Sequence, residues 1–443
     1  MTATAIPATT RPADRGPAHR DGNVLRWLAA YTASMLGDSV YFLTLGFAAA
    51  QVAGPTQVGV VMAVGAAPRA LLMLGGGVVA DRFGPRRVVI GSDAVRCVLI
   101  LCAAAAFAVT SPGLWLLVAL EVVFGTVDAL FMPAVGALPP RIVAPDQMVR
   151  LQGMRALAIR ASTILGPPIG GLAMGTGGPK VAFAVAGGLF AVSVPLLVAT
   201  VMSPLPAKAA AAADPGTADD PGADAGGSGA WHDLLDGLRY IRRHPLVGPL
   251  VLSGAICELG LVGPLNVGMV LLSQDRGWGS AGYGWIIGAF GVGAVASGLL
   301  LTVKGRLPRA GAVQIGTLFV SSLTLGLIGV GHSLGFSIAM AVLTGLFCGV
   351  CGGLSASLVQ TAAAPGYLGR VTSVMSLTSF GLAPLAYPLF GAAVGAWGPT
   401  PVFLASAGFG ALGGVIGLLT PAIRRAELPR AERRTPAART ESA

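Results

Sequence analysis

Long apolar runs recur along most of this chain, and they constrain its fold more than any other feature of the sequence. Twelve of them have about the 20 residues that a helix needs to cross the roughly 30 Å hydrocarbon core of a bilayer. The chain is 54% hydrophobic and 11% charged, with a mean hydropathy of +0.76, and a water-soluble chain of 443 residues could not bury so much apolar surface. The sequence therefore predicts an all-α integral membrane protein whose spans cover residues 26–49, 56–79, 88–109, 112–134, 152–174, 180–202, 247–272, 281–303, 310–330, 333–356, 370–394 and 400–421.

The positions of the basic residues predict how the chain is oriented. All but six of the 29 Lys and Arg residues lie in the two tails, the central linker, or the loops that follow even-numbered spans. Cytoplasmic loops carry such an excess, so we expect a multi-pass protein of the plasma membrane with both termini in the cytoplasm. The net charge of +10 then reflects topology and implies no nucleic-acid partner. The six exceptions are Arg69, Arg96, Arg155, Arg160, Lys180 and Arg276.

A polar stretch divides the spans into two sets of six. Residues 203–230 are rich in Pro, Ala, Gly and Asp, which is typical of a disordered linker, and the following WHDLLDGLRYIRRH has the apolar spacing of an amphipathic helix at the membrane surface. The predicted organisation is a cytoplasmic tail, a six-helix bundle, a linker with its amphipathic helix, a second six-helix bundle and a second tail, at residues 1–25, 26–202, 203–245, 246–421 and 422–443.

The two sets of spans also resemble each other. A shift of 220 residues aligns several residues at corresponding places: Arg150 with Arg370, Pro168 with Pro388, Gly171 with Gly391, and Gly125 with Gly345. So constant a shift indicates duplication, and two pseudo-symmetric bundles joined by a linker are the arrangement expected of an alternating-access transporter.

The loop between spans two and three carries a recognisable motif. The stretch GGGVVADRFGPRRV resembles the loop 2–3 signature of the major facilitator superfamily through Gly77, Asp81, Arg82, Gly84, Arg86 and Arg87. The resemblance covers the whole chain: twelve spans, a central linker and the motif at its expected place. It implies the major facilitator fold, and it implies that Asp81 engages the start of span eleven near Arg370 to hold an inner gate shut. The alternative is that the loop is only a topological anchor.

Two further stretches narrow the resemblance. In span five, ILGPPIGG is similar to the superfamily's antiporter motif at Gly166, Pro167, Pro168, Gly170 and Gly171, although Ser162 stands where a fuller pattern has glycine. A packing kink is the alternative interpretation. FMPAVGALPPRIV and GRVTSVMSL look like the branch that contains macrolide-efflux proteins and the enterobactin exporter.

These resemblances imply a monomeric secondary transporter that exports amphipathic small molecules, such as drugs or secondary metabolites, by proton antiport. Multidrug efflux and antibiotic resistance are the associated roles. Siderophore export is an alternative, and a membrane receptor or scaffold without transport activity is a further one. A mostly apolar set of spans favours lipophilic cargo over sugars.

Carboxylates inside the spans are candidates for proton coupling, because a charge in the bilayer core costs about 2.5–3.5 kcal/mol on insertion scales. Asp38 shifted by 220 residues falls on Glu258, so the repeat predicts that these acids face each other across a central cavity. We expect them to form the proton and cationic-substrate site, assisted by Glu121, with Arg69 as the embedded counter-charge. The alternative is that Asp38 and Arg69 form a purely structural ion pair.

The remaining embedded groups have more ordinary interpretations. Asp93 and Arg96, three residues apart, predict a local pair, and Arg155 or Arg160 could pair with Asp128. Cys348 and Cys351 have a redox-like spacing without an accompanying His, so we interpret them as packing residues and expect no disulfide or metal site. All four His residues lie outside the cavity-forming stretches, so we do not expect an enzyme, and we expect no bound cofactor. The motif GxxxxGK[ST] is absent, which disfavours ATP-driven pumping.

Overall fold

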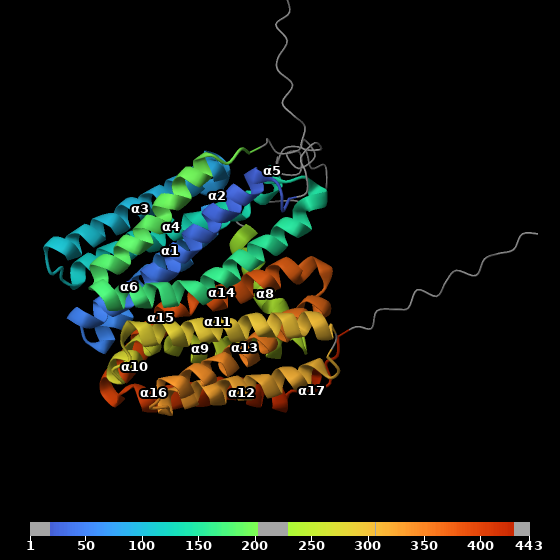
Figure 1. Cartoon of the computed structure of the whole chain (residues 1–443). Helices are drawn as coiled ribbons and strands as arrows, with labels where there is room; N and C mark the ends of the chain where they lie inside the picture. Colours follow the sequence, from blue (N-terminus) through green and yellow to red (C-terminus); the bar gives the residue numbers. More distant parts are fainter. Residues whose placement is uncertain (1–17, 203–228, 306, 429–443) are drawn as a thin grey trace, which may run out of the picture.

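The computed structural model describes residues 18–202, 229–305 and 307–428 (Figure 1). Within them, the side chains at 73–78, 81, 229–234, 365, 379 and 380 are outside the description. Every assigned element of the described ranges is helical. The linker predicted at 203–230 lies almost entirely outside these residues, as do most of the two tails.

The first half of the chain forms four separate long helices and one continuous pair. These are α1 (Gly22–Val52), α2 (Pro55–Phe83), α3 (Pro85–Val109), α4 (Leu114–Gly136) and α6 (Met148–Val198), with the short α5 (Pro139–Ile142) and η2 (Pro145–Gln147) before α6. The 51 residues of α6 are two spans in sequence, because Gly178 breaks the helix with φ 70° and ψ −163°. Glycine has no Cβ and adopts this conformation without strain.

The second half repeats this pattern with more interruptions. After α8 (Gly229–Arg243), its first span consists of α9 (Val247–Gly263), the π-helical η3 (Pro264–Gly268) and α10 (Met269–Asp275). The other elements are α11 (Gly279–Lys304), α12 (Ala310–Val330), α13 (Leu334–Ala362), η4 (Pro365–Tyr367), α14 (Leu368–Gly381), α15 (Ala383–Trp397), α16 (Pro399–Leu419) and α17 (Pro421–Arg424).

These helices account for the predicted spans. Ten segments of the described chain are long and apolar enough to cross a membrane, and one of them, Pro145–Val198, contains the two predicted spans on either side of Gly178. The run predicted at 56–79 lies inside α2, and the run at 370–394 is divided between α14 and α15. The all-α membrane class is confirmed.

The helices pack as two bundles that lie side by side (Figure 1). In the first bundle α1 and α3 pack on α6, and α2 packs on α4; in the second, α11 and α12 pack on α13, and α9 and α12 pack on α16. Two helix pairs make the most extensive contacts between the bundles, α6 with α11 and α2 with α15, and smaller contacts join α2 to α14 and α1 to α10.

Glycines and prolines make these joining contacts close. A Cβ at Gly284 would lie 2.5 Å from the Pro167 carbonyl oxygen, and one at Gly288 would lie 2.9 Å from the Pro168 ring. Gly171 faces the backbone of Ser280 across the same contact. The only non-helical dihedrals of α6 are those of Gly178, so the glycine-proline stretch of span five serves as the packing face between the bundles.

Among the described residues, the apolar cluster that the two bundles share lies toward one end of the molecule. One cluster of buried apolar side chains draws on both bundles, whereas the other two each belong to a single bundle. The shared cluster includes Phe47, Val58, Val270 and Phe390; the separate ones are represented by Trp27, Val89 and Phe131, and by Leu250, Val350 and Val371. We call the end with the separate clusters the basic end, because it carries Arg86 after α2 and Arg424 in α17. There α6 and α11 diverge, toward α5 and α17 (Figure 1).

The joining contact gives a first testable prediction. Gly284→Ala is expected to destabilise the protein by about 1–3 kcal/mol, because the added methyl group meets the Pro167 backbone, which cannot move aside like a flexible side chain. The measurement is the thermal unfolding midpoint of the purified protein in detergent. Gly298→Ala on the same helix is the control, since no atom lies within 4 Å of its Cβ position and alanine favours a helix. Equal midpoints for the two variants would contradict the packing role.

Candidate functional site

A network of charged side chains lies inside the first bundle, and Arg96 of α3 is at its centre. Arg96 is fully buried. Its Nη1 is 3.3 Å from Asp38 Oδ1 and 3.7 Å from Asp93 Oδ1, and its Nη2 is 2.7 Å from Asp128 Oδ1. One guanidinium group thus binds carboxylates from α1, α3 and α4, which its planar array of five N–H donors allows.

Arg69 of α2 extends this network toward the second bundle. Its Nε lies 2.7 Å from Asp128 Oδ2, so Asp128 bridges two arginines. The alternative in which Asp38 and Arg69 pair directly is not what the described side chains show, because the long side chain of Arg96 reaches Asp38 from α3. The expected partners of Asp128 were also wrong: the Arg155 guanidinium lies 5.2 Å from the Tyr31 ring instead.

Aromatic and hydroxyl groups enclose the network. The Arg96 guanidinium carbon lies 4.3 Å from the ring centre of Phe131 and 5.2 Å from that of Phe124. Ser34 and Ser193 donate hydrogen bonds of 3.1 and 2.6 Å to the two oxygens of Asp93. The predicted Asp93–Arg96 pair is present, as part of this larger buried network rather than as an isolated local pair.

A cavity between the two bundles borders the network. It has a volume of about 220 Å³. Glu121 of α4 lines it and accepts a 2.7 Å hydrogen bond from the hydroxyl group of Tyr41. Glu121 packs directly on Gly65, where no side chain would fit. We call it the interbundle cavity, and its walls are Phe42, Met62, Ala66, Arg69 and Glu121 from the first bundle and Val262, Asn266, Ala383 and Tyr387 from the second.

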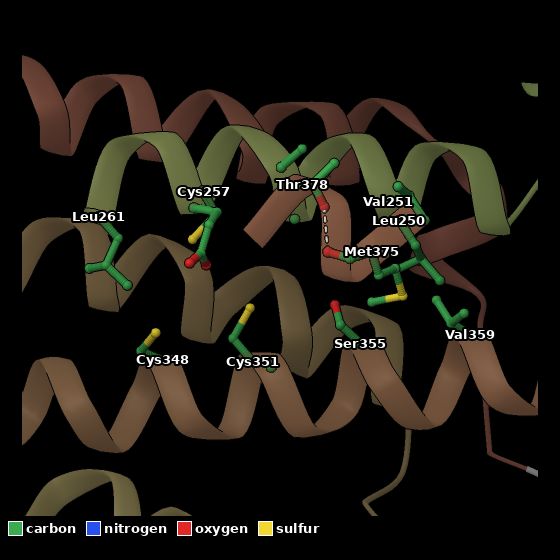
Figure 2. Close-up of a pocket in the computed structure, with 14 residues that line it drawn as sticks. Leu250, Val251, Cys257, Leu261, Cys348, Cys351, Ser355, Val359, Met375 and Thr378 are labelled. Carbon is green, nitrogen blue, oxygen red and sulfur yellow. Dashed lines mark hydrogen bonds between the residues drawn. The ribbon is translucent and has the colours of Figure 1, made fainter. Parts of the chain in front are cut away.

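A second cavity, of about 200 Å³, lies within the second bundle between α9, α13 and α14 (Figure 2). Glu258 lines it together with Cys257, and α13 contributes Cys348, Cys351 and Ser355. On α14, Thr378 donates a 2.7 Å hydrogen bond to the Met375 carbonyl oxygen and is thereby held at the cavity wall. We call this the thiol cavity. In the described part of the chain, no Lys, Arg or His lies within ion-pair distance of Glu258.

The two acids that the repeat aligns have different surroundings. Asp38 is bound to Arg96 inside the first bundle, whereas Glu258 lines the thiol cavity of the second. That the two acids face each other across a central cavity stays a prediction. Their surroundings differ because the counterpart of Arg96 220 residues later is Gly316, and the counterpart of Asp128 is Cys348. The repeat preserved an acid but replaced its ion-pair partners with small side chains.

The signature loop has the expected turn. Gly84 joins α2 to α3 with φ 84°, in the region that favours glycine, and the Arg86 Nη2 donates a 2.8 Å hydrogen bond to the Val198 carbonyl oxygen. Arg82 and Arg87 are exposed near this turn. The surroundings of Gly77 and the side chain of Asp81 are outside the description, so the gating contact expected for Asp81 stays a prediction. Arg370 donates a 2.9 Å hydrogen bond to Asp236 of α8.

The comparison with known protein families agrees with the membrane fold described above. Residues 27–383 match the sequence profile described as Major Facilitator Superfamily. The chain belongs to this superfamily. Its members are transporters, so the chain is a membrane transporter for a small molecule and not an enzyme.

Individual relatives are more distant. The chain is 25% identical over 346 residues to the Enterobactin exporter EntS of Shigella boydii serotype 18, an alignment that covers 78% of this chain and 77% of the relative. The match to the Enterobactin exporter EntS of Escherichia coli has the same identity and coverage.

Solved structures show the same fold. The crystal structure of the nucleoside transporter NupG has a TM-score of 0.65 at 12% identity and covers 90% of this chain and 99% of its own. A bacterial homolog of the human lysosomal transporter Spinster, in an inward-facing and occupied conformation, has a TM-score of 0.68 at 13% identity, with 91% and 98% covered. At these identities the likeness concerns the fold alone.

Sequence reasoning missed how far the charge network extends. It treated Asp93, Arg96 and Asp128 as local pairs, and it did not single out Tyr41, which lies three residues after Asp38 and binds Glu121. One signal was available: charges embedded in neighbouring spans must neutralise one another, so the acids and arginines of spans one to four form one set.

Proposed function

We propose that this protein is a proton-coupled exporter of amphipathic small molecules. The observation that carries the proposal is an imbalance of embedded charge. In and beside the network, four carboxyl groups share two guanidinium groups: Asp38, Asp93, Glu121 and Asp128 against Arg69 and Arg96. Ionisation of all four acids would leave uncompensated charge in the membrane core, whereas protons can neutralise the excess.

Arg69 and Glu121 connect this excess of negative charge to the cavity in which cargo would bind. Both line the interbundle cavity, and Arg69 also binds Asp128, which in turn binds Arg96. A proton or cationic group that neutralises Glu121 changes the field at Arg69 and, through Asp128, at Arg96. In this proposal the first bundle senses cavity occupancy through these ion pairs.

Alternating access would follow from the position of the shared apolar cluster toward one end of the two bundles. With the basic end in the cytoplasm, the separation of the two apolar clusters at that end supports an inward-facing state, and cargo would enter the interbundle cavity from the cytoplasm. Parting of the shared cluster would then open the opposite side. Proton entry on the outside would drive the return, as in an antiporter.

The cavity walls favour an amphipathic cargo. Phe42, Met62, Val262 and Tyr387 offer apolar and aromatic surface, while Arg69, Glu121 and Asn266 offer a few directional polar contacts. Siderophore export is the second candidate, and the similarity to enterobactin exporters favours it. Arg69 suits the anionic oxygens of such a cargo, whereas Glu258 in the thiol cavity suits a cationic amine.

Transport by reconstituted protein tests the proposal. The purified chain in proteoliposomes that contain a pH-sensitive dye is expected to move protons when a lipophilic amine, a macrolide or a catecholate siderophore is added on one side. Glu121→Gln is expected to reduce this substrate-dependent proton flux severalfold, because the amide cannot bind or release a proton. Cargo movement without proton movement would contradict proton coupling, and the absence of both would favour the scaffold alternative.

A further inference from the structure

The helix α8 precedes the second bundle in the sequence, and it presents two different faces. Gly237, Tyr240, Ile241 and His244 follow the spacing of one helical stripe, and these residues face the second bundle. Ile241 is 5% exposed and belongs to the same apolar cluster as Val247, Leu250 and Val371. The helix therefore lies directly against the ends of α9 and α14, at the level where the apolar spans begin.

Specific contacts fix this position. The Arg370 Nη1 donates a 2.9 Å hydrogen bond to Asp236, and the Tyr240 ring stacks on Tyr367 at 4.2 Å between centres. The Ala364 backbone N–H donates a 3.1 Å hydrogen bond to the Tyr240 hydroxyl group. These contacts attach α8 to η4 and to the start of α14.

The opposite stripe of α8 has no partner of this kind among the described residues. Leu235, Leu238, Arg239 and Arg242 follow one another at helical spacing, and all are exposed; the leucines are 44% and 51% exposed. With Arg243 they line an open cavity of about 480 Å³. Arginine next to exposed leucine on a helix at the membrane surface matches the boundary between phospholipid headgroups and acyl chains.

We propose that this face of α8, Leu235, Leu238, Arg239, Arg242 and Arg243, binds the phosphate headgroup of an anionic phospholipid. Guanidinium groups bind phosphate oxygens through paired hydrogen bonds, and the leucines cover the adjoining acyl carbons. The four aspartates of residues 214–224 could also attract these arginines. That segment contains no leucine, isoleucine, valine, methionine or aromatic residue, so it would leave the leucines largely uncovered.

Lipid binding at this site would affect the position of α14, so that position would depend on the lipid composition of the membrane. Because α8 is attached to α14 through Asp236 and Tyr240, a bound headgroup would hold both helices at the membrane surface. This role is independent of the cargo and of proton coupling, since none of these side chains lines the interbundle or thiol cavity.

Native mass spectrometry of the full chain in detergent tests the site. Titration with phosphatidylglycerol and with phosphatidylcholine gives the dissociation constant for the first bound lipid of each kind. The wild type is expected to prefer phosphatidylglycerol, and Arg239→Gln with Arg242→Gln is expected to weaken its binding about 25-fold, since each arginine near a membrane surface contributes about fivefold. Binding of phosphatidylcholine should not change.

Arg424→Gln with Arg425→Gln is the matched control, because it removes the same charge from two exposed arginines, the last residue of α17 and the residue after it, at the same end of the protein. An equal loss of phosphatidylglycerol binding in this control would overturn the proposal, since the preference would then be a general effect of charge. A preference unchanged by the α8 substitutions would also overturn it, and is the result expected if residues 214–224 occupy the face.

Discussion

Glu258→Gln is expected to reduce substrate-dependent proton flux to the background of protein-free vesicles. Glutamine keeps the size of the side chain and much of its hydrogen-bonding ability, but it cannot exchange a proton. Glu258 lines the thiol cavity without an ion-pair partner in the described chain, so no neighbouring arginine fixes its charge. The measurement is dye acidification in proteoliposomes, alongside exchange of labelled cargo without a proton gradient, which should persist.

The same variant should remain folded. Replacing an unpaired embedded carboxylate with a neutral amide removes a desolvation cost, so the unfolding midpoint is expected to be unchanged or higher. Ser355→Ala is the control, because Ser355 lines the same cavity and carries no exchangeable charge. Normal proton flux in Glu258→Gln would leave proton coupling to Glu121 and the charge network of the first bundle alone, and would contradict the role of Glu258.

Arg96→Met is expected to cause the largest loss of stability of any substitution considered for this protein. It leaves Asp38, Asp93 and Asp128 without their shared partner in a buried site, and breaking a buried ion pair from one side costs about 3–5 kcal/mol. The measurement is the unfolding transition of the purified protein. The defect should shrink as the pH falls, because protonation removes the uncompensated negative charges.

Arg160→Met is the matched control for this prediction. Arg160 is an exposed arginine of α6 that forms no ion pair within the described part of the chain, so its loss is expected to change stability by less than about 1 kcal/mol. Adding Asp38→Asn to Arg96→Met should recover part of the stability, since one stranded carboxylate is removed. Equal defects for Arg96→Met and Arg160→Met would contradict the central position of Arg96.

The difference between the predicted and observed pairing of Asp38 shows where sequence reasoning reached its limit. The repeat located Asp38 and Glu258 at equivalent points of two equivalent helices, but their environments differ because Arg96 has a glycine at its equivalent place. The ion pairs depend on which side chain can reach across a bundle, which is a matter of three-dimensional distance. Neither the spacing nor the repeat contains that distance.

The sequence by itself determined the membrane class, the family resemblance, the existence of the spans and the short list of embedded charges. These follow from hydropathy and from the cost of burying charge, which act residue by residue along the chain. Only the tertiary structure decided that Arg96 gathers three carboxylates, that Glu121 and Arg69 border the interbundle cavity, and that Glu258 lines the thiol cavity. Those outcomes depend on helix packing, because the reach of a side chain and the partners around it are fixed only when the helices meet.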